Sequence, residues 1–231
     1  MNRQIEPTRL VPAYTVAEAA HYLRLPVPTL RSWAVGRTYT TQAGPKRALP
    51  ALKIPSRDPA MLSFVNLVEA HVLASITRDF DVPLQTVRRA VRYLQKEFGS
   101  DHPLIERVLE TDRRDLFIRE AGRLVNVSRG GQVAILEVVG LYLSRIEWDR
   151  AGFAMRLYPF TGKAELHAPK AVVIDPHLAF GRPVLTGTTI PTQVIAERFK
   201  AGDSPQVLAK DYGRGPSEML EAIRCELAIA A

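Results

Sequence analysis

The sequence predicts a mainly α-helical protein with small β-hairpins. It is organised as a winged helix-turn-helix region, an α+β middle region and a carboxyl-terminal, helix-turn-helix-like module of three helices. Apolar residues recur at helical spacing in 15–35, where two prolines interrupt them; longer amphipathic repeats occupy 61–98; and prolines and glycines delimit short segments after 191. Proline and glycine at such places mark helix ends. We expect the three regions to cover residues 1–58, 59–164 and 165–231.

Composition indicates a globular protein. The chain has 231 residues, of which 46% are hydrophobic and 24% are charged, which is typical of folded domains. No apolar run reaches the length of a membrane span, and the opening MNRQIEPTRL lacks the apolar core of a signal peptide. A single cysteine, Cys225, excludes an internal disulfide, and we expect it to be buried. These features predict a cytoplasmic protein without a membrane partner.

Positive charge is concentrated in the first quarter of the chain. Residues 1–58 hold nine lysines and arginines against three acidic residues, a net charge of +6. Residues 59–164 hold fifteen against thirteen, and residues 165–231 hold seven against eight, giving +2 and −1. A basic region of this kind suits a polyanion such as nucleic acid. Charge alone leaves open a solvated basic face without a partner.

The segment TVAEAAHYLRLPVPTLRSW predicts two short helices joined by a tight turn. Thr15 and Glu18 have the spacing of a capping box, so the first helix is expected over 16–24. The prolines of LRLPVP fit the turn and the first turn of a second helix over 28–35, which Gly36 can end. Helix, turn and short helix form the unit whose second helix enters the DNA major groove.

The second of these helices carries the predicted base contacts. Leu30 and Trp33 are expected to pack inward, which leaves Thr29, Arg31 and Ser32 available to base edges or nearby phosphates. A helix of this kind reads DNA through the side chains of its first turns. We therefore predict that these three side chains face double-stranded DNA.

The segment GRTYTTQAGPKRALPALKI predicts a β-hairpin wing after the helix pair. Residues 38–41 favour a strand, AGPKR favours a turn and residues 49–54 can form the returning strand. Phosphate contacts from such a wing give affinity and orientation rather than sequence choice. The alternative is an unstructured basic loop. The predicted contact residues are Arg37, Tyr39, Lys46, Arg47 and Lys53.

The stretch YTVAEAAHYLRLPVPTLRSW resembles the first helix-turn-helix of MerR-like and excisionase-like DNA-binding domains. These typically read Y-T-x-x-E-x-A and then T-L-R-x-W/Y. Matching residues are Tyr14, Thr15, Glu18, Ala20, Thr29, Leu30, Arg31 and Trp33. The departure is Arg24, where the family commonly has a small residue or glycine before the turn. Arg24 therefore adds a predicted phosphate contact.

Two longer helices are predicted in the middle region. The first, over 61–76, carries His71 near its apolar face, and a core histidine is favoured over a metal ligand. The second, over 84–98, follows a possible cap at Asp81, and its apolar residues alternate three and four apart, as in a packed helix pair or a dimer seam. Its opposite face favours a solvated surface over a second DNA contact, with both left open. That face comprises Arg88, Arg89, Arg92 and Lys96.

The rest of the middle region predicts mixed structure. RDLFIRE, the turn AGR and LVNVSRGG favour a β-hairpin over 114–131, followed by a helix over 134–148 and a strand over 152–159. The pair Gly130 and Gly131 is too short a pattern for a phosphate loop, which needs more glycines and a lysine. We interpret this region as packing.

The carboxyl-terminal sequence from Val173 to about Leu227 resembles the domain-of-unknown-function 433 family. That family typically reads I-x-x-x-P-x-x-x-G-x-P-x-I-x-G-T-R-I-P, followed by a D/E-x-x-A-x-x-Y helix pair. Matching residues are Pro176, Gly181, Pro183, Gly187, Thr188, Ile190, Pro191, Gly202, Ala209 and Tyr212. Thr189 stands where the family usually has arginine. We expect a short hairpin with turns at Gly181 and Gly187, then helices over 192–200, 205–212 and 216–229.

This last module is predicted to bind a protein partner rather than DNA, because its net charge is −1 and counterion release needs cations. Phe199 can also be an apolar contact, although filling the small core is the favoured alternative. The predicted partner-binding residues are Phe180, Arg182, Thr186, Thr188, Gln193 and Arg214.

Together, the two resemblances match the group of large VapB-type antitoxins. This resemblance implies a protein that binds its operator DNA, represses its own operon and neutralises a PIN-like ribonuclease toxin. We also expect a homodimer, because operators are usually palindromic and the seam over 84–98 can pair helices, and we expect no cofactor. One alternative is a stand-alone MerR-like regulator without a toxin. The other is an enzyme, which the sequence disfavours: we find no nucleophile motif, no zinc-ligand pair and no metal site, since Asp79, Asp81, Asp175 and His177 resemble helix-boundary or turn residues.

Overall fold

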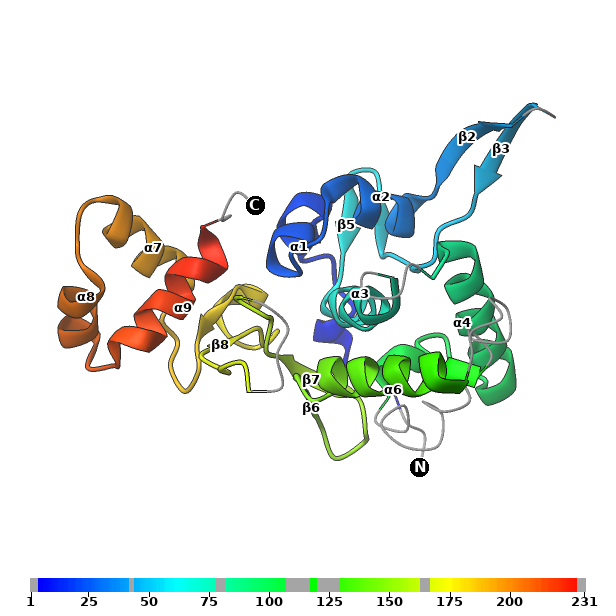
Figure 1. The fold of residues 1–231 in the computed structure, drawn as a ribbon. Helices are drawn as coiled ribbons and strands as arrows, with labels where there is room; N and C mark the ends of the chain where they lie inside the picture. Colours follow the sequence, from blue (N-terminus) through cyan, green and yellow to red (C-terminus); the bar gives the residue numbers. More distant parts are fainter. Residues whose placement is uncertain are drawn as a thin grey trace.

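The computed structural model describes residues 4–41, 44–77, 82–106, 117–119, 129–162 and 167–227. Figure 1 shows a mainly helical molecule in which a two-stranded arm projects at one end and the last three helices form the other end. The small sheets are all antiparallel pairs or a three-stranded ribbon. The predicted fold class, mainly α with small β-hairpins, is confirmed.

The predicted helix pair is present. Helix α1 spans Val16–Tyr22 and α2 spans Val27–Val35, with Gly36 (φ 83°) ending the second. The capping box is complete: the Thr15 hydroxyl accepts from the Glu18 amide at 3.1 Å, and the Glu18 carboxylate accepts from the Thr15 amide at 2.9 Å. On α2, Leu30 and Trp33 are buried as expected. Helix α1 ends two residues before the expected Arg24.

The wing exists, but its second strand differs from the prediction. Strand β2 (Arg37–Thr41) pairs with β3 (Gly44–Ala48) in a register that places Arg37 opposite Ala48 and Thr40 opposite Pro45. The expected returning strand over 49–54 is wrong, because GPKRA itself forms β3. Pro45 lies in a two-stranded ribbon, where a missing amide donor is tolerated at an edge.

A second small sheet, which the sequence did not predict, supports the helix pair. It joins β1 (Tyr14–Thr15), β5 (Ala60–Leu62) and β4 (Ser56–Arg57) in the order β1-β5-β4. Tyr14 lies opposite Leu62. The pairing brings the residue just before α1 against a strand almost fifty positions later, so the start of the helix pair is fixed from both sides.

Three longer helices form the body of the molecule: α3 (Phe64–Thr77), α4 (Leu84–Phe98) and α6 (Arg129–Leu143). Every residue of α3 from Phe64 to Ile76 is buried. His71 is a core residue as expected: its Nε2 lies 3.0 Å from the Tyr142 carbonyl oxygen, and burial lowers its pKa to about 4. The apolar seam of α4 is also used within the chain, since Val87 and Leu94 are buried.

The remainder of the middle region departs from the sequence prediction. Residues 117–119 are helical, not a strand, and the rest of the expected hairpin before α6 lies outside the described residues, as does the expected cap at Asp81. Helix α6 begins at Arg129, so it includes the glycine pair. The helix expected to reach residue 148 ends at Leu143. The residues after it form strand β6 (Ile146–Trp148), which pairs with β7 (Ala154–Leu157). Side chains support this pairing: the Glu147 carboxylate accepts from Arg156 at 3.1 Å and from the Tyr158 hydroxyl at 2.5 Å.

Short 3₁₀ segments connect these elements. They are η1 (Pro7–Arg9), η2 (Pro103–Ile105) and η4 (Ala179–Gly181). Arg9 is buried, and its guanidinium donates to Asp149 at 2.6 Å and to the Ala154 carbonyl at 3.0 Å. One continuous apolar core runs from Tyr14 to Ile174, so the first and middle regions pack around shared side chains.

The carboxyl-terminal module matches the prediction most closely. Strands β8 (Val172–Val173) and β9 (Val184–Leu185) precede α7 (Thr192–Lys200), α8 (Pro205–Tyr212) and α9 (Pro216–Glu226). The three helices have their own small core, against which Phe199 packs. Cys225 is buried as expected, and burial raises the pKa of its thiol. Within the described ranges, no helix combines the length and apolar character that a bilayer crossing requires.

Candidate DNA-binding surface and domain interface

Helix α2 directs one of its predicted contact residues outward. Arg31 is exposed, whereas Thr29 and Ser32 are half-buried. The Ser32 hydroxyl donates to the Thr29 carbonyl at 2.8 Å, so part of its hydrogen-bonding capacity is used inside the helix. Arg31 is therefore the side chain of α2 that is best placed to reach another molecule.

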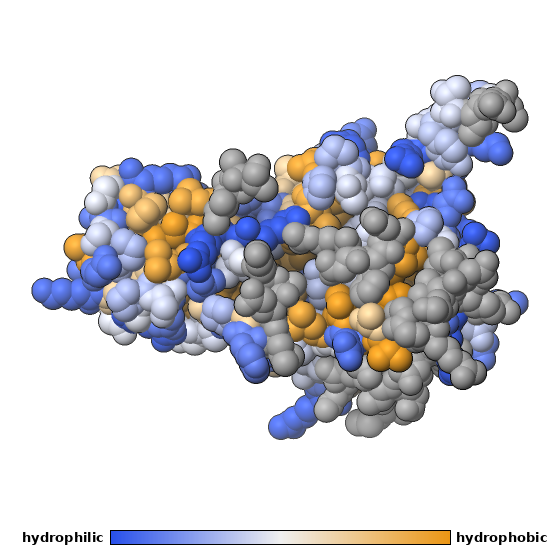
Figure 2. Space-filling model, in the orientation of Figure 1, coloured by the Kyte–Doolittle hydropathy of each residue, from blue (hydrophilic) through white to orange (hydrophobic). Residues whose placement is uncertain are grey.

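The wing carries further cations without acidic partners. Arg37, Lys46 and Arg47 are exposed, and none of the ion pairs among the described residues includes them. Figure 2 shows the projecting wing as a hydrophilic arm. Tyr39 links it to the body: its ring lies 5.9 Å from the Arg37 guanidinium, and its hydroxyl accepts from Gln85 at 3.4 Å.

Lys53 lies apart from this arm. It follows the wing, and its ammonium group pairs with Asp101 at 3.1 Å. Both side chains are largely exposed, so this pair is weak. The predicted phosphate contact from Lys53 rested on a returning strand that does not form, and we leave it out of the proposed DNA surface.

A cavity of about 1010 Å³ opens between α2, the base of the wing and the start of α4. Its described lining contains no acidic residue, whereas its cations are Arg24, Arg31, Arg37 and Arg88. Such a concentration of one sign of charge raises the local concentration of anions. The predicted DNA-contact residues Thr29, Ser32 and Tyr39 line the same cavity.

Arg24 has a different role from the predicted phosphate contact. Its Nε donates to the Phe160 carbonyl at 3.0 Å, and its Nη2 donates to the carbonyls of Thr161 and Arg224, the latter at 2.8 Å. The Arg224 carbonyl belongs to the last turn of α9, where helix carbonyls lack intrahelical partners and favour a cation. The structure therefore assigns the Arg24 side chain to the interface with the carboxyl-terminal module.

The backbone of Arg24 explains its place in the motif. Its φ is 53°, a left-handed conformation that favours glycine. This conformation ends α1 and turns the chain toward α2. The family's preference for a small residue here reflects that turn, and in this chain the three carbonyl contacts hold an arginine in it.

Other contacts join the same two parts of the molecule. The Tyr14 hydroxyl donates to the Gly181 carbonyl at 2.8 Å, and Arg182 donates to Glu18 at 2.7 Å. Burial raises the pKa of Glu18, but hydrogen bonds from Thr15 and Arg182 outweigh it, so the net pKa is lowered. Glu18 thus serves both the capping box of α1 and the domain interface. Sequence reasoning missed this second role, which depends on contacts between distant segments.

The predicted partner-binding residues fall into two groups. Phe180 is 95% exposed and has a left-handed backbone (φ 56°). The others have intramolecular partners: Arg182 binds Glu18, Thr186 donates to Lys170, Thr188 donates to Leu185, Gln193 donates to Glu197, and Arg214 donates to Thr186 and Glu218. Of the six, only Phe180 offers a large unburied apolar surface.

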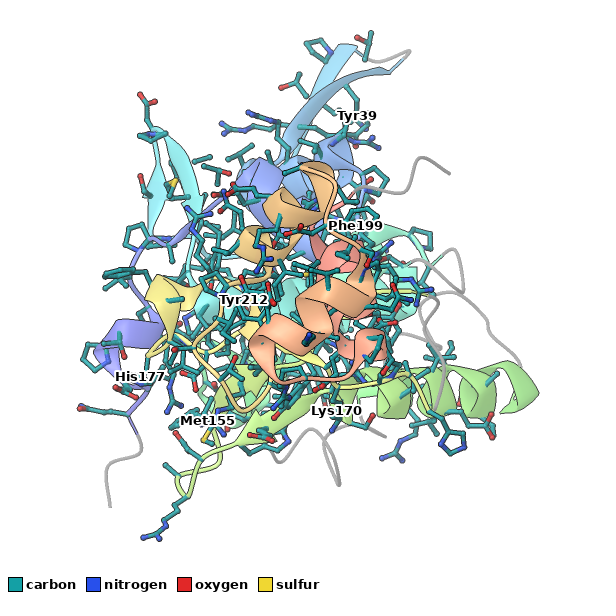
Figure 3. The ribbon with its side chains drawn as sticks, turned by 90° about the vertical axis from the view of Figure 1, so that its left-hand side faces the viewer. Tyr39, Met155, Lys170, His177, Phe199 and Tyr212 are labelled. Atoms are coloured by element: carbon teal, nitrogen blue, oxygen red, sulfur yellow. The ribbon has the colours of Figure 1, made fainter. Side chains whose placement is uncertain are left out.

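Views from a second direction separate the two candidate surfaces. In Figure 3, Tyr39 lies on the wing, whereas Phe199 and Tyr212 lie on the carboxyl-terminal helices nearest the viewer. His177 lies beside the amino-terminal segment, where its Nε2 is 3.1 Å from a Glu6 carboxylate oxygen. Asp175 accepts from Arg156 at 2.8 Å. Within the part of the chain that the structure describes, no three metal-ligating side chains converge on one point.

Comparison with known proteins connects this geometry to a family. A family model described as "Putative DNA-binding HTH domain" matches residues 12–91, and one described as "Protein of unknown function (DUF433)" matches residues 172–224. The first match includes α2, the wing and the start of α4, which together line the cavity.

Whole-chain relatives extend the comparison. The chain is 32% identical to "Putative antitoxin VapB45" of Mycobacterium tuberculosis, over 92% of this chain and 93% of that protein. It is 27% identical to "Uncharacterized protein Rv2308" of the same organism, over 91% and 88%. The crystal structure of Rv2018 from M. tuberculosis superposes with a TM-score of 0.66 at 27% identity, covering 93% of this chain and 98% of that one. The chain therefore belongs to the family of large VapB-type antitoxins, with an amino-terminal helix-turn-helix domain and a carboxyl-terminal DUF433 module.

Proposed function

We propose that this protein is a cytoplasmic, DNA-binding antitoxin that represses its own operon and neutralises a PIN-like ribonuclease toxin. The observation that carries the DNA-binding part is the set of exposed cations on α2 and the wing, which enter none of the ion pairs of the described residues, around a cavity whose described lining has no carboxylate. Membership of the VapB-type family supports the antitoxin part.

Each part of the DNA surface has a distinct role in this proposal. Arg31 reaches base edges or adjacent phosphates from α2, with Thr29 and Ser32 beside it. Arg37, Lys46 and Arg47 follow the phosphate backbone from the wing, which gives affinity without sequence choice. Tyr39 positions the base of the wing through its contacts with Arg37 and Gln85.

The toxin surface is proposed on the carboxyl-terminal module, around Phe180. Exposed aromatic side chains are frequent anchors of protein interfaces. Orange atoms also gather on this end of the molecule in Figure 2, and the exposed apolar residues on its helices are Val194, Val207 and Leu220. The arginines of the module are engaged in ion pairs, so apolar contact fits it better than DNA contact.

A homodimer completes the proposal, because operators are usually palindromic and each half-site takes one helix-turn-helix. The seam on α4 is buried within one chain. The two copies are therefore expected to meet through another surface.

The first experiment tests Arg31. Arg31→Ala in the full chain should lower affinity for the DNA upstream of its own gene, with discrimination against unrelated DNA reduced by about 1–3 kcal/mol. Fluorescence anisotropy with both duplexes measures this, and Lys200→Ala on exposed α7 is the matched charge control. Parental affinity and selectivity in Arg31→Ala would remove this residue from the proposed site.

The second experiment tests whether the chain binds and neutralises a toxin. Co-expression with the protein encoded by an adjacent reading frame should yield a complex that lacks ribonuclease activity. A chain that binds its operator selectively but forms no such complex would instead be the stand-alone regulator considered above.

A further inference from the structure

Arg88 is a buried arginine with incomplete hydrogen bonding. It lies in the second turn of α4, is 8% exposed, and its Nε and Nη2 have no hydrogen-bond partner. Burial, together with the charge of Arg92, lowers its pKa. None of the ion pairs among the described residues includes Arg88, and a buried charge without a partner is costly to a fold.

The surroundings of Arg88 already favour an anion. Pro83, Leu84 and Gln85, which begin α4, line the same cavity as Arg88. The N-cap residue, Pro83, provides no side-chain cap, and among the described residues Thr86 is the first of α4 whose amide bonds a carbonyl. Helix side chains lean toward the amino terminus, which favours a position of the Arg88 guanidinium near the first turn of α4. The amino terminus of a helix and a guanidinium together favour an anion.

The cavity itself indicates where the anion comes from. Arg31 on α2 and Arg37 on the wing line it together with Arg88, and these are the residues proposed above to face DNA. Guanidinium nitrogens match phosphate oxygens in a two-point fork. Because Nε and Nη2 of Arg88 have no partner, turning them toward the cavity mouth breaks no hydrogen bond.

We propose that Arg88 and the amino terminus of α4 form a phosphate-binding site that holds one backbone phosphate of the DNA bound by α2 and the wing. This site rests on the proposed DNA-binding function and adds a third point of contact to it. It lies outside the helix-turn-helix motif and the wing.

The test compares Arg88→Met with Arg92→Met in the full chain. Arg92 is exposed, one turn further along α4, and does not line the cavity. Anisotropy titrations across a salt series should show that Arg88→Met weakens operator and unrelated duplexes alike, by about fivefold near physiological salt. Its slope of log affinity against log salt should be shallower by about 0.9, the value for one phosphate. Arg92→Met should keep the parental slope.

A stability measurement separates this loss from misfolding. Arg88→Met removes an uncompensated buried charge, so its thermal unfolding midpoint should equal or exceed that of the parent. Weaker DNA binding by a variant of equal or greater stability supports the site. A lower midpoint that accounts for the DNA-binding loss, with the parental slope retained, would overturn it.

A second measurement locates the phosphate. Neutral methylphosphonates are introduced one at a time along the operator backbone, and affinity is measured for the parent and both variants. At one position per half-site the parent and Arg92→Met should lose affinity, while Arg88→Met should be insensitive. If no position loses its effect in Arg88→Met, the proposed contact does not exist.

A third arm separates DNA from free phosphate. Inorganic phosphate and potassium chloride are compared at equal ionic strength in thermal unfolding without DNA. If phosphate stabilises the parent but not Arg88→Met, and Arg88→Met binds DNA as the parent does, the site serves a free anion and the DNA assignment is overturned. Failure of the parent to bind its operator would instead refute the proposed function. If Arg88→Met binds DNA with the affinity and salt slope of the parent while Arg31→Ala binds more weakly, only the Arg88 site is refuted.

Discussion

The arginines at the two ends of the molecule differ in what they contact. At the amino-terminal end, Arg31 and Arg37 take part in none of the ion pairs among the described residues. In the carboxyl-terminal module, Arg198 pairs with Asp203 and Asp211 at 2.7 and 2.6 Å, and other arginines there pair with glutamates one helical turn away. Arginine is therefore available to bind another molecule at one end, whereas at the other end it forms ion pairs within the chain.

This difference is more informative than net charge alone. The module has nearly as many basic as acidic residues, yet each of its four arginines enters an ion pair within the chain. A paired cation releases no counterion when DNA approaches, whereas an unpaired one replaces a condensed ion on the phosphate backbone. Arg24 belongs with the arginines that have partners within the chain, despite its place in the helix-turn-helix motif, because it donates to backbone carbonyls.

The largest effect is expected at Arg24. Arg24→Ala should lower the free energy of unfolding by about 3 kcal/mol, because it removes charge-assisted hydrogen bonds to three carbonyls and retains the left-handed backbone. Urea denaturation of the full chain measures this. Arg24→Gly should be more stable than Arg24→Ala by up to about 1 kcal/mol, since glycine adopts this left-handed backbone freely. Equal stability of the parent and Arg24→Ala would show that Arg24 does not fasten the interface.

Phe180 should show the opposite behaviour, with an effect on binding and none on folding. Phe180→Ala is expected to weaken toxin binding by about 2 kcal/mol, roughly 30-fold, as for an interface anchor. Its unfolding midpoint should stay parental, because the ring is 95% exposed. Calorimetric titration of the toxin measures the change, and Val133→Ala on α6, an exposed apolar residue outside the proposed toxin surface, is the control. Parental toxin affinity in Phe180→Ala would place the toxin surface elsewhere.

Local signals in the sequence predicted much of the fold. The capping box of Thr15 and Glu18, the inward Leu30 and Trp33, and two of the last three helices match, because caps, prolines and helical spacing act within a few residues. Strand β6 was missed for the opposite reason: Glu147 is held by side chains of the next strand and its continuation. Such pairing overrides a local helical pattern.

The candidate site was less predictable than the fold. Arg24 looked like a surface cation because its partners lie 136 to 200 positions away. Arg88 and Arg92 share one face of the same helix in the sequence pattern, yet only Arg88 is buried. Arg88 lines the cavity that α2 and the base of the wing also line, whereas Arg92 does not. Spacing along one helix cannot reveal what another part of the chain covers.

The cations of the wing should contribute to the salt dependence of DNA affinity. Replacing both Lys46 and Arg47 by alanine should flatten the slope of log affinity against log salt by about 1.8, which corresponds to two phosphates. Affinity for operator and unrelated DNA should fall together, by at least about tenfold near physiological salt. Anisotropy in a salt series provides the measurement, with Lys210→Ala on α8 as the control. A slope as steep as the parent's would mean that the wing does not follow the backbone.

The smallest effect is expected at Arg198, which provides the matched counterpart to Arg31. Arg198→Gln removes one positive charge from α7, but that charge is already paired with two aspartates, and hydrogen bonds to Asp211, Tyr212 and Asp203 raise its pKa. Its salt slope and operator affinity should therefore equal those of the parent. Because exposed ion pairs contribute little, the unfolding midpoint should shift by less than about 2 °C. A change in the salt slope as large as that of Arg31→Ala would mean that pairing does not decide which arginines contact DNA, and total charge would then be the better guide.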